Sequence, residues 1–149
     1  MSHVTKIDTE IKDLNALAQA CEELGLELVL GKKDYRWFGR FIGDSPLPRG
    51  FRKDELGKCE HAIRVKNAKG DTYEVGVVKR RDGRNGYTLL YDYWAGGNGL
   101  IEKIGNGAST LTREYKVQVA AKKARQQGYR VVRSVAKNGK PMMEFIQRV

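Results

Sequence analysis

The spacing of apolar positions changes several times along this chain, and each change predicts a new element. Apolar and β-branched residues alternate loosely with polar ones over residues 1–11, which favours a strand. Asp13 can then cap a helix whose leucines recur at helical spacing up to Leu24, and Gly25 stands where a left-handed cap would end it. Residues 26–30 form a second apolar run. The opening pattern is therefore strand, helix, strand.

Residues 31–58 break this regularity. Four aromatic rings and two arginines occur within seven positions, in the run Tyr35-Arg36-Trp37-Phe38-Gly39-Arg40-Phe41. Pro46 and Pro48 follow and interrupt both strand and helix. An aromatic-rich linker would be poorly solvated, so we expect a long excursion of one domain rather than a linker.

The remaining pattern predicts a meander of strands, a helix and a hairpin. Turn residues separate the strands, glycines crowd residues 95–108, and Asn138-Gly139 is a strong hairpin signal. We expect strands at 61–66, 72–78 and 87–94, a helix at 111–127, and strands at 129–136 and 142–149. The glycine-rich stretch predicts a mobile loop. The sequence thus predicts one α+β domain over residues 1–149, with a mainly antiparallel sheet and two helices in the order β-α-β-(long loop)-β-β-β-α-β-β.

Length and composition narrow the class of protein. The chain has 149 residues, 40% of them hydrophobic and 31% charged, which is typical of one globular domain. No stretch approaches the roughly 20 apolar residues of a membrane span, and the start resembles no signal peptide. We therefore expect a cytoplasmic protein without a membrane partner. Cys21 and Cys59 are predicted to stay reduced in that compartment.

The formal net charge of +10 is unevenly distributed. Residues 1–30 hold two basic and six acidic side chains, whereas residues 113–149 hold ten basic and two acidic ones. Such asymmetry indicates a polyanionic partner, with nucleic acid first and an acidic protein next. A merely solvated basic surface is the other interpretation.

Two groups of cations are candidates for binding phosphate. The first lies at a predicted hairpin tip, and the second lies on the last helix. Their members are Lys79, Arg80, Arg81 and Arg84 at the tip, and Lys116, Lys122, Lys123 and Arg125 on the helix.

The aromatic run offers a different contact. Its rings could stack on unpaired bases while Arg36 and Arg40 meet phosphates. A small core beneath the loop, or a protein-contact patch, explains the same residues at least as well. The candidates for stacking or partner contact are Tyr35, Arg36, Trp37, Phe38 and Arg40.

Catalytic and metal signals are weak. Cys59 and His61 are the only closely spaced cysteine–histidine pair, which is too little for a zinc site. As nucleophile and base the same pair lacks a third, orienting group. Asp92 is a lone carboxylate for which a structural hydrogen bond is the better interpretation. The glycines of 96–107 lack the lysine of a phosphate-binding loop. We expect no metal, no cofactor and no catalytic residues.

Several short motifs occur together in order. They are the opening Met1-Ser2-His3, the helix end Leu24-Gly25, the strand Tyr73-Glu74-Val75-Gly76-Val77, the segment Asp92-Tyr93-Trp94, and a last helix followed by a hairpin. In these the chain resembles the uncharacterised plastid and cyanobacterial family called hypothetical chloroplast reading frame thirty-five, which also occurs in bacteria and bacteriophages. The resemblance implies the same α+β fold and brings no established activity or catalytic residues. Because members of the family are companions of ATPase and ferredoxin genes in some genomes, the resemblance implies an accessory role. If the chain is of phage origin, it implies a location in the host cytoplasm.

The sequence therefore predicts a small, basic, non-enzymatic accessory protein that associates with nucleic acid through backbone phosphates. Single strands or structured nucleic acid are favoured because no major-groove reading motif is present. The alternative is an adaptor subunit of a larger assembly, docking on an acidic partner through the loop around Trp37. An enzyme whose site is assembled from dispersed residues is the third hypothesis.

Overall fold

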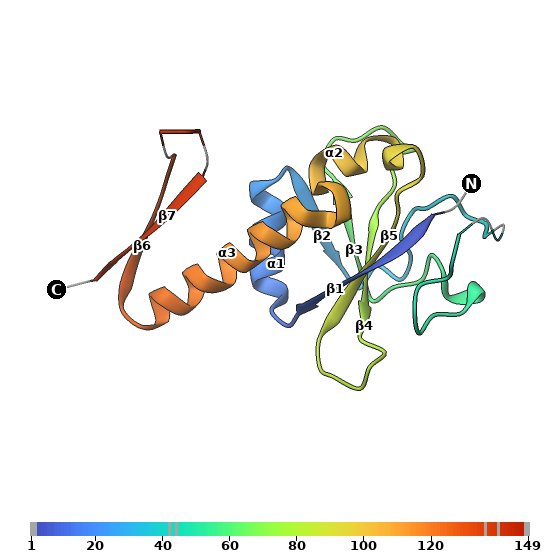
Figure 1. Cartoon of the computed structure of the whole chain (residues 1–149), viewed down its shortest axis with the longest axis horizontal. Coiled ribbons are helices and arrows are strands. Elements are labelled where there is room, and N and C mark those ends of the chain that lie inside the picture. The colour runs from blue at the N-terminus through green and yellow to red at the C-terminus, as the bar shows by residue number, and fades with distance from the viewer. Residues whose placement is uncertain (1–2, 42, 44, 136, 140, 148–149) are drawn as a thin grey trace.

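A five-stranded antiparallel sheet lies between a layer of helices and a long irregular loop in the computed structural model of this chain (Figure 1). The structure describes residues 3–41, 43, 45–135, 137–139 and 141–147. Its main elements are β1 (Val4–Ile11), α1 (Leu14–Glu23), β2 (Leu26–Leu30), β3 (His61–Val65), β4 (Val75–Lys79), β5 (Tyr87–Asp92), α2 (Leu100–Ile104), α3 (Ser109–Gln126), β6 (Tyr129–Val135) and β7 (Pro141–Gln147). The predicted α+β fold is confirmed, and the order of elements matches the prediction except for the additional short helix α2.

The strands follow the order β1-β5-β4-β3-β2, so the two halves of the opening strand–helix–strand unit form opposite edges of the sheet. Val4 pairs with Asp92 at one edge, and Leu26 pairs with Val65 at the other. The helix α1 therefore crosses the sheet from edge to edge. Its apolar side is buried on the sheet, which explains the leucine spacing in the sequence.

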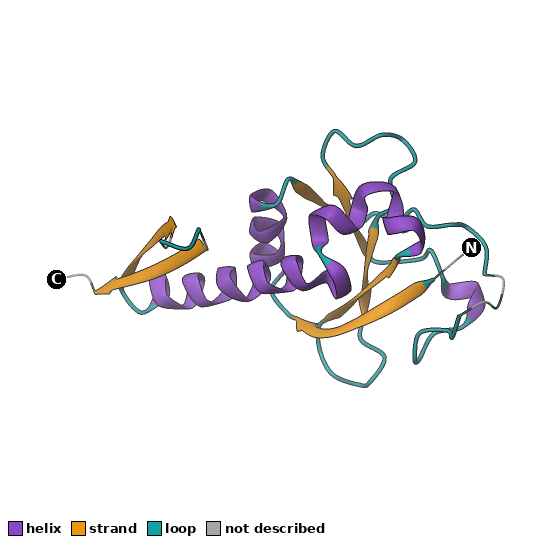
Figure 2. Cartoon of the chain, turned by 45° about the horizontal axis from the view of Figure 1, so that its top comes forward, coloured by secondary structure: helices purple, strands orange, loops and turns teal. Residues whose placement is uncertain are grey.

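Helices α1 and α3 pack together on one face of the sheet (Figure 2). The carboxylate of Asp13 caps α1 by accepting the backbone N–H of Ala16 at 3.0 Å. The hydroxyl of Tyr115 on α3 accepts the backbone N–H groups of Lys12 and Asp13, at 3.0 and 3.1 Å. Leu111 of α3 is fully buried in the same core. The last helix is thus held to the start of the first one.

The excursion of residues 31–58 covers the opposite face of the sheet. Tyr35, Phe51 and Leu56 are buried there, against sheet residues that include Val78 and Leu90. This second apolar cluster explains the aromatic density of the segment, because the excursion takes the place that a second helical layer would occupy. The small-core interpretation is confirmed for these side chains.

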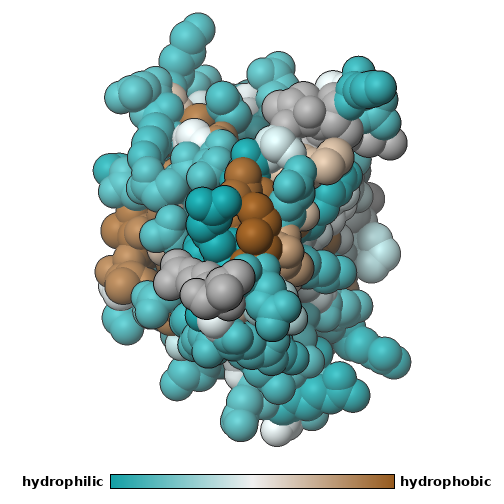
Figure 3. Space-filling view, turned by 90° about the vertical axis from the view of Figure 1, so that its left-hand side faces the viewer, coloured by the Kyte–Doolittle hydropathy of each residue, from teal (hydrophilic) through white to brown (hydrophobic). Residues whose placement is uncertain are grey.

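The hairpin β6–β7 forms a separate two-stranded sheet at the far end of α3 (Figure 1). Arg133 of β6 connects it to the body through two hydrogen bonds to the carboxylate of Glu114, at 2.9 and 2.8 Å, and lies 3.6 Å from Glu23. On this end of the molecule, groups of apolar side chains lie among polar ones (Figure 3). Phe145, on the hairpin, is 48% exposed. An isolated two-stranded sheet is marginal by itself, so the Arg133 contact is important for its position.

This contact predicts a pH dependence. Burial alone would raise the pKa of Glu114, but the hydrogen bonds from Arg133 and Gln118 outweigh it and hold that pKa below its ordinary value. A lowered folded pKa stabilises the protein above the unfolded pKa of 4.5, and this stabilisation is lost as the pH falls through the folded value. In urea unfolding, the free energy of unfolding of the wild type should exceed that of Glu114→Gln by a constant margin above pH 4.5. This margin should shrink as the pH falls below 4.5. A margin that stays constant at a pH well below 4.5 would contradict the assignment of this stabilisation to the ionised carboxylate of Glu114.

The structure corrects two details of the predicted elements and leaves two strand ends untested. Strand β4 begins at Val75 rather than residue 72, because the N–H of Tyr73 bonds to Gly97 and that of Glu74 to Arg36. The glycine-rich stretch is not a simple loop, since it contains α2, whose Leu100 is fully buried. The predicted strand ends at residues 136 and 149 fall outside the described residues.

Candidate nucleic-acid interface

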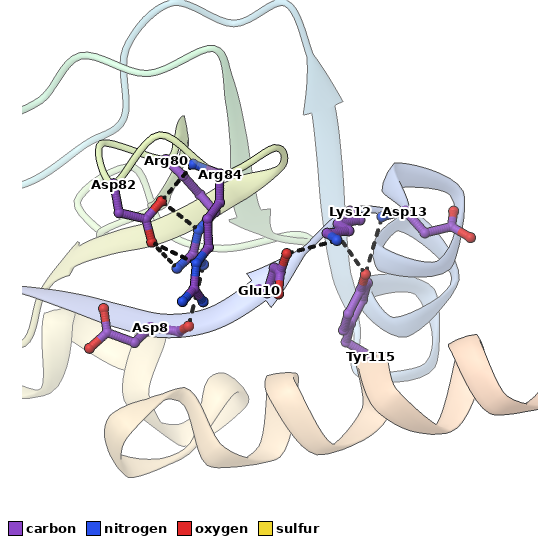
Figure 4. Close-up of polar contacts among 8 residues, drawn as sticks. All are labelled: Asp8, Glu10, Lys12, Asp13, Arg80, Asp82, Arg84 and Tyr115. Carbon is purple, nitrogen blue, oxygen red and sulfur yellow. Dashed lines mark hydrogen bonds and ion pairs between the residues drawn. The ribbon is translucent and has the colours of Figure 1, made fainter.

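The arginines of the hairpin tip between β4 and β5 have partners within the molecule. Arg80 is only 9% exposed at its side chain and lies 2.6 Å from Asp82, and Arg84 lies 3.9 Å from the same carboxylate (Figure 4). The hydrogen bond from Arg80 holds the pKa of Asp82 well below its usual range, with the backbone N–H of Arg84 acting in the same direction. Arg81 lies 2.7 Å from Glu55. These pairs shape the tip and offset its charge.

Two further contacts define the tip. The guanidinium of Arg81 lies over the ring of Phe51, 4.6 Å from its centroid, which connects the tip to the excursion. Lys79 is exposed, and no carboxylate of the described residues lies within 4.0 Å of its amine. Of the four predicted tip cations, Lys79 alone has no such partner among the described residues, and the phosphate role of all four stays a prediction.

The cations of α3 are arranged differently. Lys122 lies 2.8 Å from Asp13. Arg113, Lys116, Lys123 and Arg125 are exposed, and none has a carboxylate of the described residues within 4.0 Å. The single acidic residue of α3, Glu114, accepts hydrogen bonds from Arg133. This helix therefore presents more uncompensated positive charge than the tip. Arg113 belongs to this set although the sequence did not single it out.

The five residues predicted for stacking do not act as one group. Tyr35 is buried and Trp37 is half-buried against the second apolar cluster. The guanidinium of Arg36 donates to the carbonyl of Gly70. Phe38 and Arg40 are exposed. Of the five, Tyr35 and Trp37 thus contribute to packing, whereas Arg36, Phe38 and Arg40 are exposed.

The cysteine–histidine pair is not arranged as nucleophile and base. The thiol of Cys59 donates to the carbonyl of Lys32 at 3.2 Å, and burial raises its pKa to about 12. The ring of His61 accepts the N–H of Gly31 through Nδ1 at 2.9 Å. Each side chain is thus occupied by backbone, and the thiol is held in its protonated, unreactive form.

Asp92, at the end of β5, has a larger structural role than the sequence indicated. It is fully buried. Its Oδ1 accepts the backbone N–H groups of His3 and Trp94, both at 3.0 Å, and its Oδ2 accepts that of Phe38 at 3.1 Å. The structural interpretation of Asp92 is confirmed, and the carboxylate proves to join three segments that are distant in the chain. All three carry an aromatic ring.

Two clefts run along edge strand β1 and share residues. The first, of about 280 Å³, is lined by Lys6, Leu47, Arg49 and Tyr93 among others. The second, of about 120 Å³, also contains Lys6 and Arg49 and adds Arg80 and Arg81 at the tip. We call these two clefts together the β1 groove. It connects the aromatic end of β5 with the cationic tip, which are far apart in the sequence.

The chain matches no known family model, no curated protein and no solved structure. Within the residues that the structure describes, no helix is both long and apolar enough to span a bilayer. The same residues hold no group of three or more histidine, cysteine, aspartate or glutamate side chains placed to bind a metal ion. Any function must therefore be argued from the surfaces described above.

Proposed function

We propose that this protein is a non-enzymatic accessory protein that binds nucleic acid through backbone phosphates. The observation that carries the proposal is the exposed face of α3. Arg113, Lys116 and Lys123 follow one another at spacings of three and seven residues, which places them on one side of the helix. At a rise of about 1.5 Å per residue they span about 15 Å, enough to meet several phosphates of one strand.

The charge distribution supports this choice of surface over the hairpin tip. A cation that already contacts a carboxylate gains less from a phosphate, because its existing partner must be displaced. The tip arginines have such partners, and the three cations of the α3 face have none among the described carboxylates. Phosphate contacts of this kind read no base sequence, so we expect little sequence preference.

Salt dependence tests the proposal. Binding of the protein to a fluorescent oligothymidylate should weaken steeply with salt, as counterions are released from the strand. Replacing Arg113, Lys116 and Lys123 by glutamine should reduce the slope of log K against log salt by about 2, since each lost contact to a single strand removes about 0.7. Fluorescence anisotropy over a salt series measures both quantities.

A matched control separates this surface from net charge. Lys33, Lys58 and Lys69 are also exposed, so their replacement by glutamine removes the same charge elsewhere. That variant should retain nearly the full slope. Equal slopes for both triple variants would locate the contacts away from α3, and no binding of DNA or RNA at low salt would refute nucleic-acid binding altogether.

One observation favours the alternative, an adaptor subunit. Apolar side chains of the hairpin, including Phe145 and Met142, are exposed at the end of α3. Such a surface is typical of protein contacts. The loop around Trp37 is less suited to docking than the sequence indicated, because Trp37 packs on the second apolar cluster. If the oligonucleotide experiment fails, the hairpin becomes the first surface to test for a protein partner.

A further inference from the structure

An aromatic surface lies at one end of the β1 groove. Tyr93 and Trp94 are 44% and 38% exposed, which is unusual for such large rings. The centroid of the His3 ring lies 5.2 Å from that of Tyr93 and 5.4 Å from that of Trp94. The three rings lie at one end of the β1–β5 pair, next to the pairing of Val4 with Asp92.

The backbone beneath these rings is held in place. Asp92 accepts the N–H groups of both His3 and Trp94. After Trp94 the chain makes a left-handed turn in which residues 95–99 all have positive φ, including Ala95 at 50° and Asn98 at 53°. Such runs are costly for residues other than glycine and persist only where the surroundings fix them. The orientation of the rings is therefore set before any ligand arrives.

Cations stand beside the rings in the same cleft. Lys6 and Arg49 line it together with Tyr93; Lys6 lies 3.2 Å from Asp8, whereas Arg49 has no carboxylate of the described residues within 4.0 Å. The groove continues from there to Arg80 and Arg81 at the tip. An exposed aromatic ring next to a cation matches the pairing of base and phosphate in one strand.

We infer that the β1 groove binds an unpaired nucleotide of a single-stranded nucleic acid. The base stacks on Tyr93, and the adjoining phosphate contacts Arg49. This inference rests on the proposed function and deepens it, because it assigns a preference for single strands that phosphate contacts at α3 do not provide. A base inside a duplex is stacked on its neighbours and presents no free face to Tyr93.

Binding of oligothymidylate and of a duplex of equal length tests the inference. Stacking contributes about 1–3 kcal/mol per base, so Tyr93→Leu should weaken single-strand binding about tenfold or more and leave duplex binding unchanged. Tyr93→Phe keeps the ring and should keep the affinity. Tyr129→Leu, the same change on the hairpin, is the matched control and should have no effect on either.

A spectroscopic readout places the strand directly. In a Trp37→Phe background Trp94 is the single tryptophan, and its emission should be quenched by oligothymidylate but not by the duplex. If Tyr93→Leu changes neither affinity, or lowers both equally, the groove assignment is overturned while the salt slope at α3 still supports nucleic-acid binding. If neither oligonucleotide binds at low salt, the inference and the proposed function fall together.

Discussion

Replacing the fully buried Asp92 by alanine is expected to destabilise the fold by about 4 kcal/mol, because three backbone N–H groups lose a charged acceptor at once. The affected donors belong to the first strand, the excursion and the turn after β5. The domain has on the order of 5–15 kcal/mol of stability in total, so this variant should be partly unfolded at modest urea concentrations. Urea unfolding followed by circular dichroism gives the value.

Asp92→Asn provides the graded control. Its amide keeps one oxygen for His3 and Trp94, but it turns an N–H₂ group toward the N–H of Phe38. We expect a loss of about half that of the alanine variant, since two of three bonds can be retained. If both variants unfold at the wild-type midpoint, Asp92 does not hold these segments together.

The second large effect is expected at Gly76, in the centre of the sheet. A Cβ added there would lie 2.4 Å from Cδ1 of Tyr35 and 2.6 Å from its Cε1. Tyr35 is buried and cannot swing into solvent without opening the second apolar cluster. Gly76→Ala should therefore cost about 3 kcal/mol, at the upper end of the usual range for overpacking. The midpoint of urea unfolding measures this loss.

A double-mutant cycle identifies the cause of that loss. Tyr35→Leu removes the ring edge, so in combination with Gly76→Ala it should be less destabilising than the two single costs predict, by about 2 kcal/mol. Gly70→Ala is the control, because a methyl group there meets no atom within 4 Å and φ is not left-handed. Strictly additive costs would show that the Gly76 methyl group is accommodated elsewhere.

Local signals predicted most of the elements. Asp13 and Gly25 mark the two ends of the first helix, and Asn138-Gly139 marks the hairpin turn, because caps and tight turns depend on neighbouring residues. Strand β4 was predicted too long because its start depends on residues that are distant in the sequence. The backbone partners of Tyr73 and Glu74 come from segments that no local pattern connects to them.

The candidate site depended more strongly on tertiary structure. The pairing of Asp82 with Arg80 and Arg84 could have been foreseen, since the residues lie two apart in a turn. The contact of Arg81 with Glu55 could not. The β1 groove gathers side chains from the first strand, the proline segment, the hairpin tip and the end of β5, so its existence has no counterpart in any window of the sequence.

The pairing of β1 with β5 also has a consequence for biosynthesis. His3 and Asp92 form a hydrogen bond across 89 residues of chain. At a synthesis rate of about 5–20 residues per second, the first strand must wait roughly 4–18 s on the ribosome before its partner is made. During that interval α1 can form locally but has no complete sheet to cover, and the apolar side chains of both stay accessible to chaperones. The pairing of β1 in the sheet is thus completed only after β5 has been synthesised.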